Sequence, residues 1–222
     1  MYRSLCLALG CVMLGNAAWG AAKPHVIAFG KWTTIQLPAD ADDSEVADTK
    51  ARALYIDGKL KEFTLGTPHE ITDRLFVVRR AFRLNDSLPQ ETSGPRWRWQ
   101  RGGWLLVDRA TGHVAAVSLP EFDTDNSAAS WYRDYVAYCG VSDDGKKTFT
   151  IVMQLGRRKP ILKQLWREAR AETDTGCAPP DWQRQPVRVT FAAAEGKKVS
   201  YAIHGHAVDM VTEESEPEEG AQ

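Results

Sequence analysis

Apolar residues recur at every second position along most of this 222-residue sequence, and turn-forming pairs interrupt the runs at short intervals. Segment 74–84 is the clearest case, because Phe76, Val78 and Phe82 share one parity and Arg79 and Arg83 the other. The same alternation recurs in three later segments: 148–155, 187–191 and 199–203. Since successive side chains of a strand point to opposite faces, the pattern predicts half-buried β-strands.

Short connections separate the predicted strands. Asp57-Gly58 lies between 51–56 and 59–65 and is typical of a two-residue type I′ hairpin turn, in which both residues take positive φ. Further reversals are predicted at Gly102-Gly103, Thr111-Gly112, Asp144-Gly145, 156–160 and Glu195-Gly196. Connections this short favour antiparallel neighbours, because a parallel crossover needs a dozen residues or more.

Helix signals are confined to 165–172 and 43–49, and no regular alternation of strands with helices is visible. With 43% apolar and 26% charged residues, the composition is that of a soluble globular protein. We therefore predict an all-β, single-domain antiparallel sheet array over 23–211, arranged as a sandwich, a barrel or a propeller-like assembly, with one or two short helices. Long loops are expected at 38–47, 84–95 and 120–129.

The start of the chain has the features of a secretory signal peptide. Arg3 precedes an apolar run from Leu5 to Leu14, and small residues follow as far as Ala22. We predict a signal peptide over 1–22 cleaved after Ala22, with cleavage after Gly20 and a lipid anchor on Cys11 as alternatives. The run is too short for a transmembrane helix, and no transmembrane segment is predicted later. We expect export to a periplasm or to the medium.

Removal of the signal peptide leaves Cys139 and Cys177 as the cysteines of the chain. In an oxidising compartment such a pair usually forms a disulfide, which stabilises the fold by about 3–4 kcal/mol on the chain-entropy model. The alternative is two buried or half-buried thiols.

Charge is concentrated at the end of the chain. Six acidic residues and no basic residue lie between Asp209 and Gln222. We predict a disordered acidic tail over 212–222 that serves solubility, or alternatively folds over a basic face or a partner. The remaining body is only modestly basic, so no nucleic acid partner is predicted.

Two stretches resemble blade strands of β-propeller proteins. Trp104–Val114 is similar to a strand followed by an Asp-x-x-Thr-Gly turn and a second strand, and Val141–Phe149 contains a Ser-x-Asp-Gly-Lys turn of the same class. Together they cover about 20 residues. The resemblance implies a local blade-like sheet and carries no catalytic residue.

Catalytic motifs with a known spacing are missing from the sequence. It contains no His-Glu-x-x-His, Walker A, Gly-x-Gly-x-x-Gly or Cys-x-x-Cys segment. Ser142 follows Gly140-Val141 as in a nucleophile elbow, but Asp144 stands where the second glycine belongs and a strand follows. No cofactor is predicted.

Two groups of residues are candidate metal ligands. His204 and His206 would share a face of an extended strand and could bind one metal with a third ligand. In the loop 120–127, Asp123 and Asp125 alternate with Glu121 as calcium ligands or hydrolytic acids do. A solvent-facing histidine pair and a solvated loop are the ordinary interpretations.

The most unusual composition is the aromatic and basic run 96–104. Alternation places Trp97, Trp99 and Arg101 on one face. A covered face would make the tryptophans core anchors, which the clean alternation favours. An open face would be a stacking platform for sugars or peptides, with Arg101 adding a cation–π contact.

These observations favour an exported non-catalytic β-domain that binds a partner protein, a glycan or an envelope component through an open sheet face or edge. The first alternative is a hydrolase whose site is assembled from Glu121, Asp123, Asp125, His204 and His206. The second is an envelope structural or assembly factor whose strand edges pair with another chain.

Overall fold

The computed structural model describes residues 24–38, 46–90, 92, 94–168, 178–192 and 198–211. These residues form antiparallel strands and contain no helix, which confirms the predicted all-β class. The predicted signal peptide and acidic tail lie outside the described residues.

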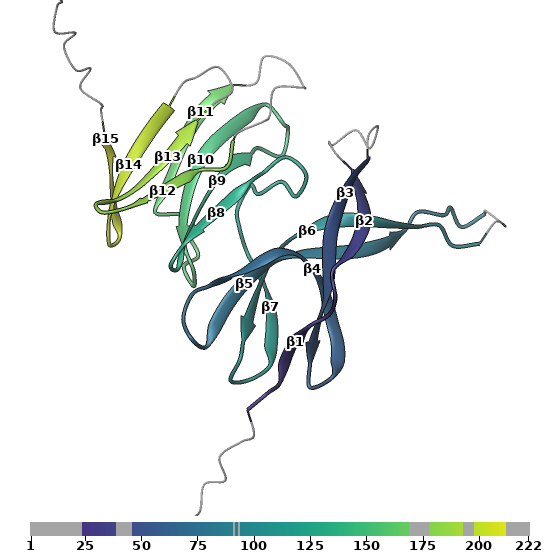
Figure 1. Cartoon of the computed structure of the whole chain (residues 1–222). Coiled ribbons are helices and arrows are strands. Elements are labelled where there is room, and N and C mark those ends of the chain that lie inside the picture. The colour runs from purple at the N-terminus through teal and green to yellow at the C-terminus, as the bar shows by residue number, and fades with distance from the viewer. Residues whose placement is uncertain are drawn as a thin grey trace, which may run out of the picture.

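The strands form three sheets (Figure 1). Sheet A has the order β1-β3-β4-β5-β6-β7, with β2 also paired to β3, and comprises β1 (Ile27–Phe29), β2 (Thr33–Pro38), β3 (Val46–Ile56), β4 (Lys59–Glu70), β5 (Leu75–Asn85), β6 (Trp97–Asp108) and β7 (His113–Val117). Sheet B has the order β11-β10-β9-β8 and comprises β8 (Ala129–Tyr132), β9 (Tyr135–Val141), β10 (Lys147–Gln154) and β11 (Leu162–Glu168). Sheet C follows chain order and comprises β12 (Asp181–Arg184), β13 (Val187–Ala192), β14 (Lys198–His204) and β15 (Ala207–Val211).

The backbone φ angles at several hairpins agree with the turns predicted from the sequence. Asp57 and Gly58 have φ values of 52° and 75°, as the predicted type I′ turn between β3 and β4 requires. Gly112 and Gly145 also take positive φ, at 62° and 69°. The predicted reversal at Glu195-Gly196 lies outside the described residues.

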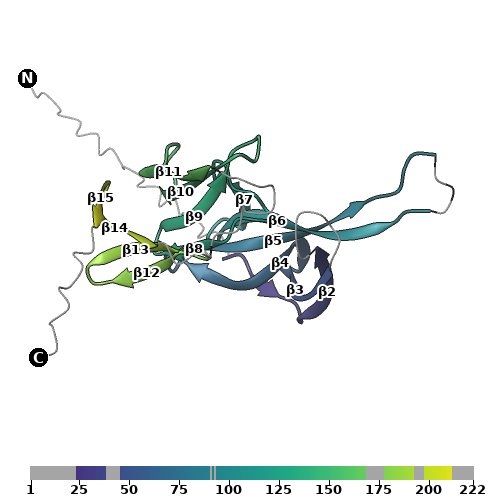
Figure 2. The ribbon, with the colours of Figure 1, turned by 90° about the horizontal axis from the view of Figure 1, so that it is seen from above.

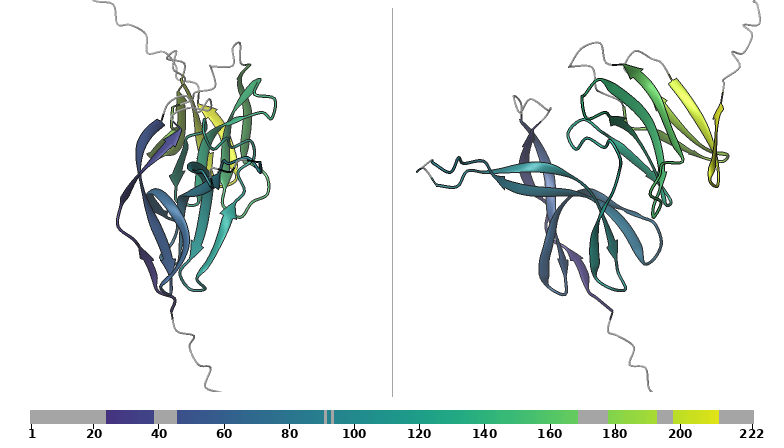
Figure 3. Two further views of the ribbon diagram at one scale, coloured as in Figure 1. Left: turned by 90° about the vertical axis from the view of Figure 1, so that its right-hand side faces the viewer. Right: turned by 180° about the vertical axis from the view of Figure 1, so that it is seen from behind.

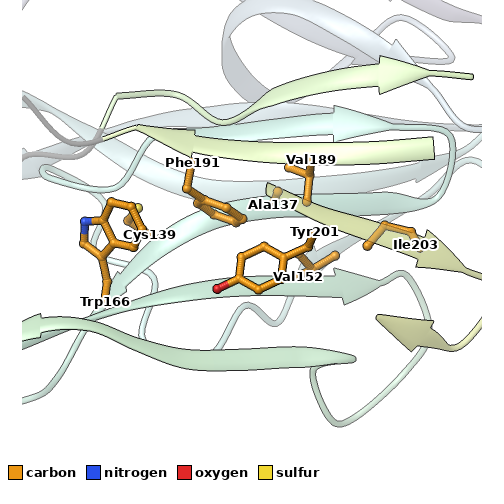
Figure 4. Packing of buried hydrophobic residues seen from close by; sticks show 8 residues of the cluster. All are labelled: Ala137, Cys139, Val152, Trp166, Val189, Phe191, Tyr201 and Ile203. Atoms are coloured by element: carbon orange, nitrogen blue, oxygen red, sulfur yellow. The ribbon is translucent and has the colours of Figure 1, made fainter. Parts of the chain in front are cut away.

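Sheets B and C are the two layers of a sandwich, as Figure 3 shows. One buried cluster fills the space between them, and the close-up in Figure 4 labels its members: Ala137, Cys139, Val152, Trp166, Val189, Phe191, Tyr201 and Ile203. The rings of Phe191 and Tyr201 meet edge to face at 6.0 Å. Of the predicted arrangements, the sandwich therefore fits and a closed barrel does not.

Sheet A buries apolar side chains on both of its faces. One face carries the cluster Leu54, Ile56, Phe76, Val78, Leu105 and Val107. The other carries the cluster Ile35, Leu37, Ala51, Leu65 and Ala81, which β2 helps to cover. Sheet A and the sandwich thus have separate interiors.

The two segments that resemble propeller blades both form antiparallel hairpins. Trp104–Val114 supplies the end of β6, a turn and the start of β7, and Val141–Phe149 joins β9 to β10. The resemblance itself rests on the sequence alone.

Both predicted helical segments are strands wherever the structure describes them. Leu165 lies in β11 opposite Phe149, and Trp166 is buried in the sandwich. Val46 begins β3 and lies opposite Pro38 of β2. Pairing with neighbouring strands outweighs the weak local preference for helix at both places. No described helix has the length and hydropathy needed to span a membrane.

The predicted reversal at Gly102-Gly103 is wrong, because β6 runs without a break from Trp97 to Asp108. The register between β5 and β6 shifts here, since Arg79 pairs with Trp104 and Ala81 with Arg101. The two strands therefore differ by one residue, which is a β-bulge. A Cβ on Gly102 would lie 3.0 Å from the Cβ of Arg80, so glycine permits the close approach.

A two-stranded arm projects from sheet A. We define it as 82–101, the far ends of β5 and β6 with their connection. The pairing of β4 with β5 ends at Phe63 and Ala81, so beyond this point β5 and β6 pair only with each other (Figure 2). Leu84, Leu88 and Trp97 are exposed along this arm.

Candidate binding surface

Strand β6 places Trp97, Trp99 and Arg101 on one face, as the sequence predicts. Their partners on β5 are Asn85, Arg83 and Ala81. The face is continuous with the cluster under β2, because Ala81 belongs to that cluster. The aromatic run therefore extends a covered region of sheet A outward along the arm.

Trp99 packs against the body of sheet A. Its ring meets that of Phe63 edge to face with centroids 5.0 Å apart, and it contacts the cluster under β2. The guanidinium of Arg83, directly opposite on β5, lies 4.9 Å from the centre of the Trp99 ring. The predicted cation–π role of Arg101 is thus taken by Arg83. Arg101 instead donates a hydrogen bond from Nη1 to the carbonyl oxygen of Pro38.

Trp97 is 57% exposed, so the prediction of a core anchor is wrong for this residue. The reason is topological. The pairing of β4 with β5 ends at Phe63 and Ala81. Trp97 pairs with Asn85, beyond that point, so its side chain has no neighbour on β4 to pack against. A large apolar ring is therefore presented to solvent beside a packed one.

A groove of about 430 Å³ lies between β2 and the outer part of β6. We call it the Trp97 groove; its lining residues are Thr34, Ile35, Gln36, Pro38, Val46, Trp97, Arg98, Trp99 and Gln100. The lining combines two indoles with amide, hydroxyl and guanidinium groups. Such a mixture of apolar surface and a few polar groups is common in ligand sites.

The arm around the groove is basic. It contains four arginines, Arg83, Arg96, Arg98 and Arg101, against the two acids Asp86 and Glu91. The Nε atoms of Arg96 and Arg98 lie 3.7 and 3.5 Å from the Asp86 carboxylate. These exposed pairs contribute little to stability.

The predicted calcium loop has internal partners. The Asp123 carboxylate accepts hydrogen bonds from the backbone N–H groups of Asp125 and Asn126, at 2.8 and 3.1 Å, and from the Asn126 amide at 3.0 Å. Burial opposes ionisation of Asp123, but these hydrogen bonds outweigh it and hold its pKa below the usual value. At Asp125, burial and the neighbouring Asp123 charge raise the pKa.

Arg79 provides the positive charge near this loop. Its guanidinium donates to the carbonyl oxygens of Thr124 and Ser127, and both loop aspartates lie near enough to interact with it. Burial and then the nearby Arg101 lower the pKa of Arg79. Sheet A thus supplies a cation where the sequence suggested a metal.

Glu121 also has a structural partner, because Lys163 of β11 forms an ion pair with it. The described residues contain no group of three or more His, Cys, Asp or Glu side chains arranged to hold a metal ion.

The histidine pair lies at one end of sheet C, in the hairpin between β14 and β15. His204 ends β14, and Gly205-His206 forms the turn to β15. The predicted extended geometry is therefore wrong, because a residue in a two-residue turn does not share a strand face with His204. The Nε2 atom of His204 lies 3.9 Å from the Asp209 carboxylate.

Of the predicted disulfide pair, Cys139 is only 2% exposed and faces sheet C from β9. Cys177 lies outside the described residues, so the bridge stays a prediction.

A second cleft of about 480 Å³ lies where sheet A meets sheet B. It is mainly apolar, and its lining includes Leu75, Leu106, Leu119, Trp131, Val136, Met153 and Leu155. This cleft lies in the junction between sheet A and the sandwich. The loop 120–127 also lies in this junction, because Arg79 of sheet A donates hydrogen bonds to it.

Sequence reasoning missed the roles of Arg79 and Arg83. Both arginines lie on the same strand face as Trp99 and Arg101, but that relationship depends on the register of β5 against β6. A long connection joins the two strands and a bulge shifts their pairing, so the register cannot be predicted from the length of the turn. The alternation in 74–84 was the available signal, because it set both arginines opposite the apolar face.

Comparison with models of known protein families finds none that matches this chain, and comparison with curated proteins finds no significant match.

Proposed function

We propose that this chain is an exported, non-catalytic binding protein that holds a partner protein or glycan in the Trp97 groove. The observation that carries the proposal is the exposed indole of Trp97 at the rim of a groove whose inner wall includes the packed indole of Trp99. Large exposed aromatic groups beside a concave surface are typical of interaction sites, where burial of a tryptophan often dominates affinity.

The groove is held by rigid elements. Phe63 and Arg83 fix the Trp99 ring from two sides, and Arg101 ties β6 to the end of β2. A ligand that enters therefore meets a preformed wall and orders few side chains, which lowers the entropic cost of binding.

Binding is favoured over hydrolysis by the partners of the acidic residues. Glu121 pairs with Lys163, Asp123 accepts the hydrogen bonds of its own turn, and Asp125 faces Arg79. These contacts give each acid a structural role, either within the loop or between the loop and the sheets. Export is supported by the signal-peptide pattern in 1–22 and by the Cys139 and Cys177 pair expected to form a disulfide.

Site-specific photo-crosslinking in cells of the source organism tests the proposal. A photoreactive benzoyl-phenylalanine placed at position 97 keeps an aromatic ring at the groove, and the same group at the exposed Trp32, which is not part of the groove lining, is the matched control. We expect a discrete adduct in the exported fraction from position 97 and none from position 32. Adducts of equal yield at both positions, or at neither, contradict the proposal.

A glycan array probed with labelled wild-type protein and with the Trp97→Ala variant distinguishes a sugar from a protein partner. Because Trp97 is largely exposed, its replacement should change the free energy of unfolding by less than about 0.5 kcal/mol, so loss of binding would report the site rather than the fold.

A further inference from the structure

We infer that the cleft between sheet A and sheet B binds a small amphiphile, with its apolar chain between the two sheets and its anionic head group at Arg157. We call this space the junction cleft. It is a site separate from the Trp97 groove, because the two share no lining residue. The inference therefore goes beyond the proposed function and does not depend on it.

Both walls of the junction cleft are apolar. Sheet A contributes Leu75, Leu106 and Val117, and the sandwich contributes Trp131 and Met153. All of these side chains except that of Met153 are only partly buried, so both sheets leave apolar surface uncovered at their junction. Removal of such surface from water is favourable in proportion to its area. A hydrocarbon chain that fills the cleft therefore gains free energy from both walls.

The cleft has the size of a small-molecule site. Its volume of about 480 Å³ lies in the range of known ligand pockets, which are common where two bodies meet. Trp131 also packs on Trp104 of sheet A, so the cleft is bordered by a contact that joins the two bodies.

The polar side chains of the lining are few. They are Ser118, Gln154 and Arg157, and the Gln154 amide already donates to the Asp134 carboxylate at 2.8 Å. A peptide would bring a backbone donor and acceptor with almost every residue, and this lining has few side chains to match them. We therefore commit to a small molecule with a hydrocarbon chain rather than to a peptide.

Arg157 selects the charge of the head group. It is the only residue of the lining with an ionisable side chain. Arg157 is exposed, and no carboxylate in the described part of the chain pairs with it. Arg158 and Lys159 follow in the same turn, and segment 156–160 contains no acid.

The acids on the elements around the cleft do not line it and have partners of their own. The pairs are Asp108 with Arg74, Glu121 with Lys163, Asp134 with Gln154, and Asp73 with the charge of Arg109. An anionic head group at the cleft therefore meets Arg157 without a carboxylate in the lining, whereas a cationic one would face three basic residues of the turn.

The test uses the exported protein labelled with ¹³C at the methionine methyl groups. Removal of the predicted signal peptide leaves Met153, in the cleft wall, and Met210, exposed on β15. Dodecanoate, titrated below its critical micelle concentration, should shift the Met153 signal and leave that of Met210, which is the internal control. The Met210→Leu variant assigns the two signals.

Chain length and head charge are then varied. Each buried methylene group contributes about fourfold to affinity, so octanoate should bind at least about tenfold more weakly than dodecanoate. Dodecyltrimethylammonium has the same chain with a cationic head and should also bind at least about tenfold more weakly. Dodecyl phosphate distinguishes a lipid phosphate from a carboxylate, and the tighter of the two anions identifies the preferred head group.

Two arginines of one turn provide a matched pair of variants. Arg157→Gln should weaken dodecanoate binding at least about threefold, because the head group loses its cation. Arg158→Gln removes the same charge from a residue that does not line the cleft and should bind like wild type. Ser118→Trp fills the cleft from an exposed position and should abolish the Met153 shift with little change in the thermal unfolding midpoint.

The inference is overturned if dodecanoate leaves the Met153 signal in place or shifts both methionine signals equally. Equal affinity of the anionic and cationic amphiphiles, or equal losses in the Arg157 and Arg158 variants, would also reject it. Crosslinking at position 97 reports on the Trp97 groove alone, so failure of this proposal and failure of the proposed function are distinguishable.

Discussion

The indole rings of Trp104 in β6 and Trp131 in β8 meet edge to face with their centroids 5.4 Å apart. This contact joins sheet A to the sandwich. The imidazole of His69 lies on Trp131 at 6.1 Å, and its Nε2 atom is 2.9 Å from the carbonyl oxygen of Arg133. Trp131 is therefore held between two side chains of sheet A and forms part of the contact between sheet A and the sandwich.

Replacing Trp131 with alanine should weaken this junction. The change removes the ring contacts with Trp104 and His69 and leaves a void, so we expect a loss of roughly 3 kcal/mol in the free energy of unfolding. Urea denaturation followed by circular dichroism measures it. Leu88→Ala, at an exposed position of the arm, is the control and should change stability by less than about 0.5 kcal/mol. Equal stability of the two variants would contradict the role of Trp131.

Gly102 and Gly103 should respond differently to alanine. A Cβ at position 102 would lie 3.0 to 3.2 Å from three side-chain carbons of Arg80, whereas one at position 103 would meet no atom within 4 Å. Arg80 also pairs with Glu62 at 2.9 Å, and the nearest of these atoms is its Cβ, which is attached directly to the backbone of β5. We expect Gly102→Ala to cost about 1–2 kcal/mol and Gly103→Ala to be nearly neutral, as measured by thermal and urea unfolding. Identical costs would argue against the bulge.

Asp125→Asn should stabilise the protein at neutral pH. The folded-state pKa of Asp125 is raised by burial and by Asp123, so its ionised form is disfavoured in the fold. This penalty is present above the unfolded pKa of about 3.8 and disappears as the pH falls below it. The variant should therefore exceed wild type in urea midpoint at pH 7 and match it near pH 3.

Asp123→Asn should show the opposite sign. Its folded-state pKa is lowered by the hydrogen bonds of the turn, despite burial, so the ionised carboxylate stabilises the fold above the unfolded pKa. This contribution is lost as the pH falls toward the folded-state pKa. We expect a lower urea midpoint than wild type at pH 7 and a smaller difference near pH 3. Changes of the same sign in the two variants would contradict the assignment of the loop charges.

Mass spectrometry of the exported protein should find an N-terminus at Lys23 and a link between Cys139 and Cys177. Reduction should add the mass of two hydrogens, and replacing both cysteines with serine should cost about 3–4 kcal/mol. Retention of residues 1–22, or free thiols in the unreduced protein, would count against export to an oxidising compartment.

Local pattern predicted most strands but not every connection. The alternation around Phe76 and the turn at Asp57-Gly58 needed only neighbouring residues, and both are confirmed. Gly102-Gly103 had the composition of a turn, but the strand continues because β6 pairs with β5 on both sides of these glycines, and Gly102 leaves space for Arg80. The segment containing Leu165 had helical spacing, but pairing with β10 makes it a strand.

The candidate site was predicted only in part for the same reason. The shared face of Trp97, Trp99 and Arg101 follows from their spacing alone. Which tryptophan is covered depends on where β4 leaves β5, and which cation lies over Trp99 depends on the pairing of Arg83. His204 and Asp123 were both predicted as metal ligands, but His204 lies in sheet C and Asp123 in the loop between β7 and β8.

The order of residues by itself determined the all-β class and the two faces of each strand, because alternation and turn chemistry act over a few neighbouring positions. Only the tertiary structure decided that β2 stands beside β6, that Trp97 remains exposed while Trp99 packs on Phe63, and that one edge of β6 is open. These features depend on register and on where strands leave one another, which long-range packing energies set and local sequence does not encode.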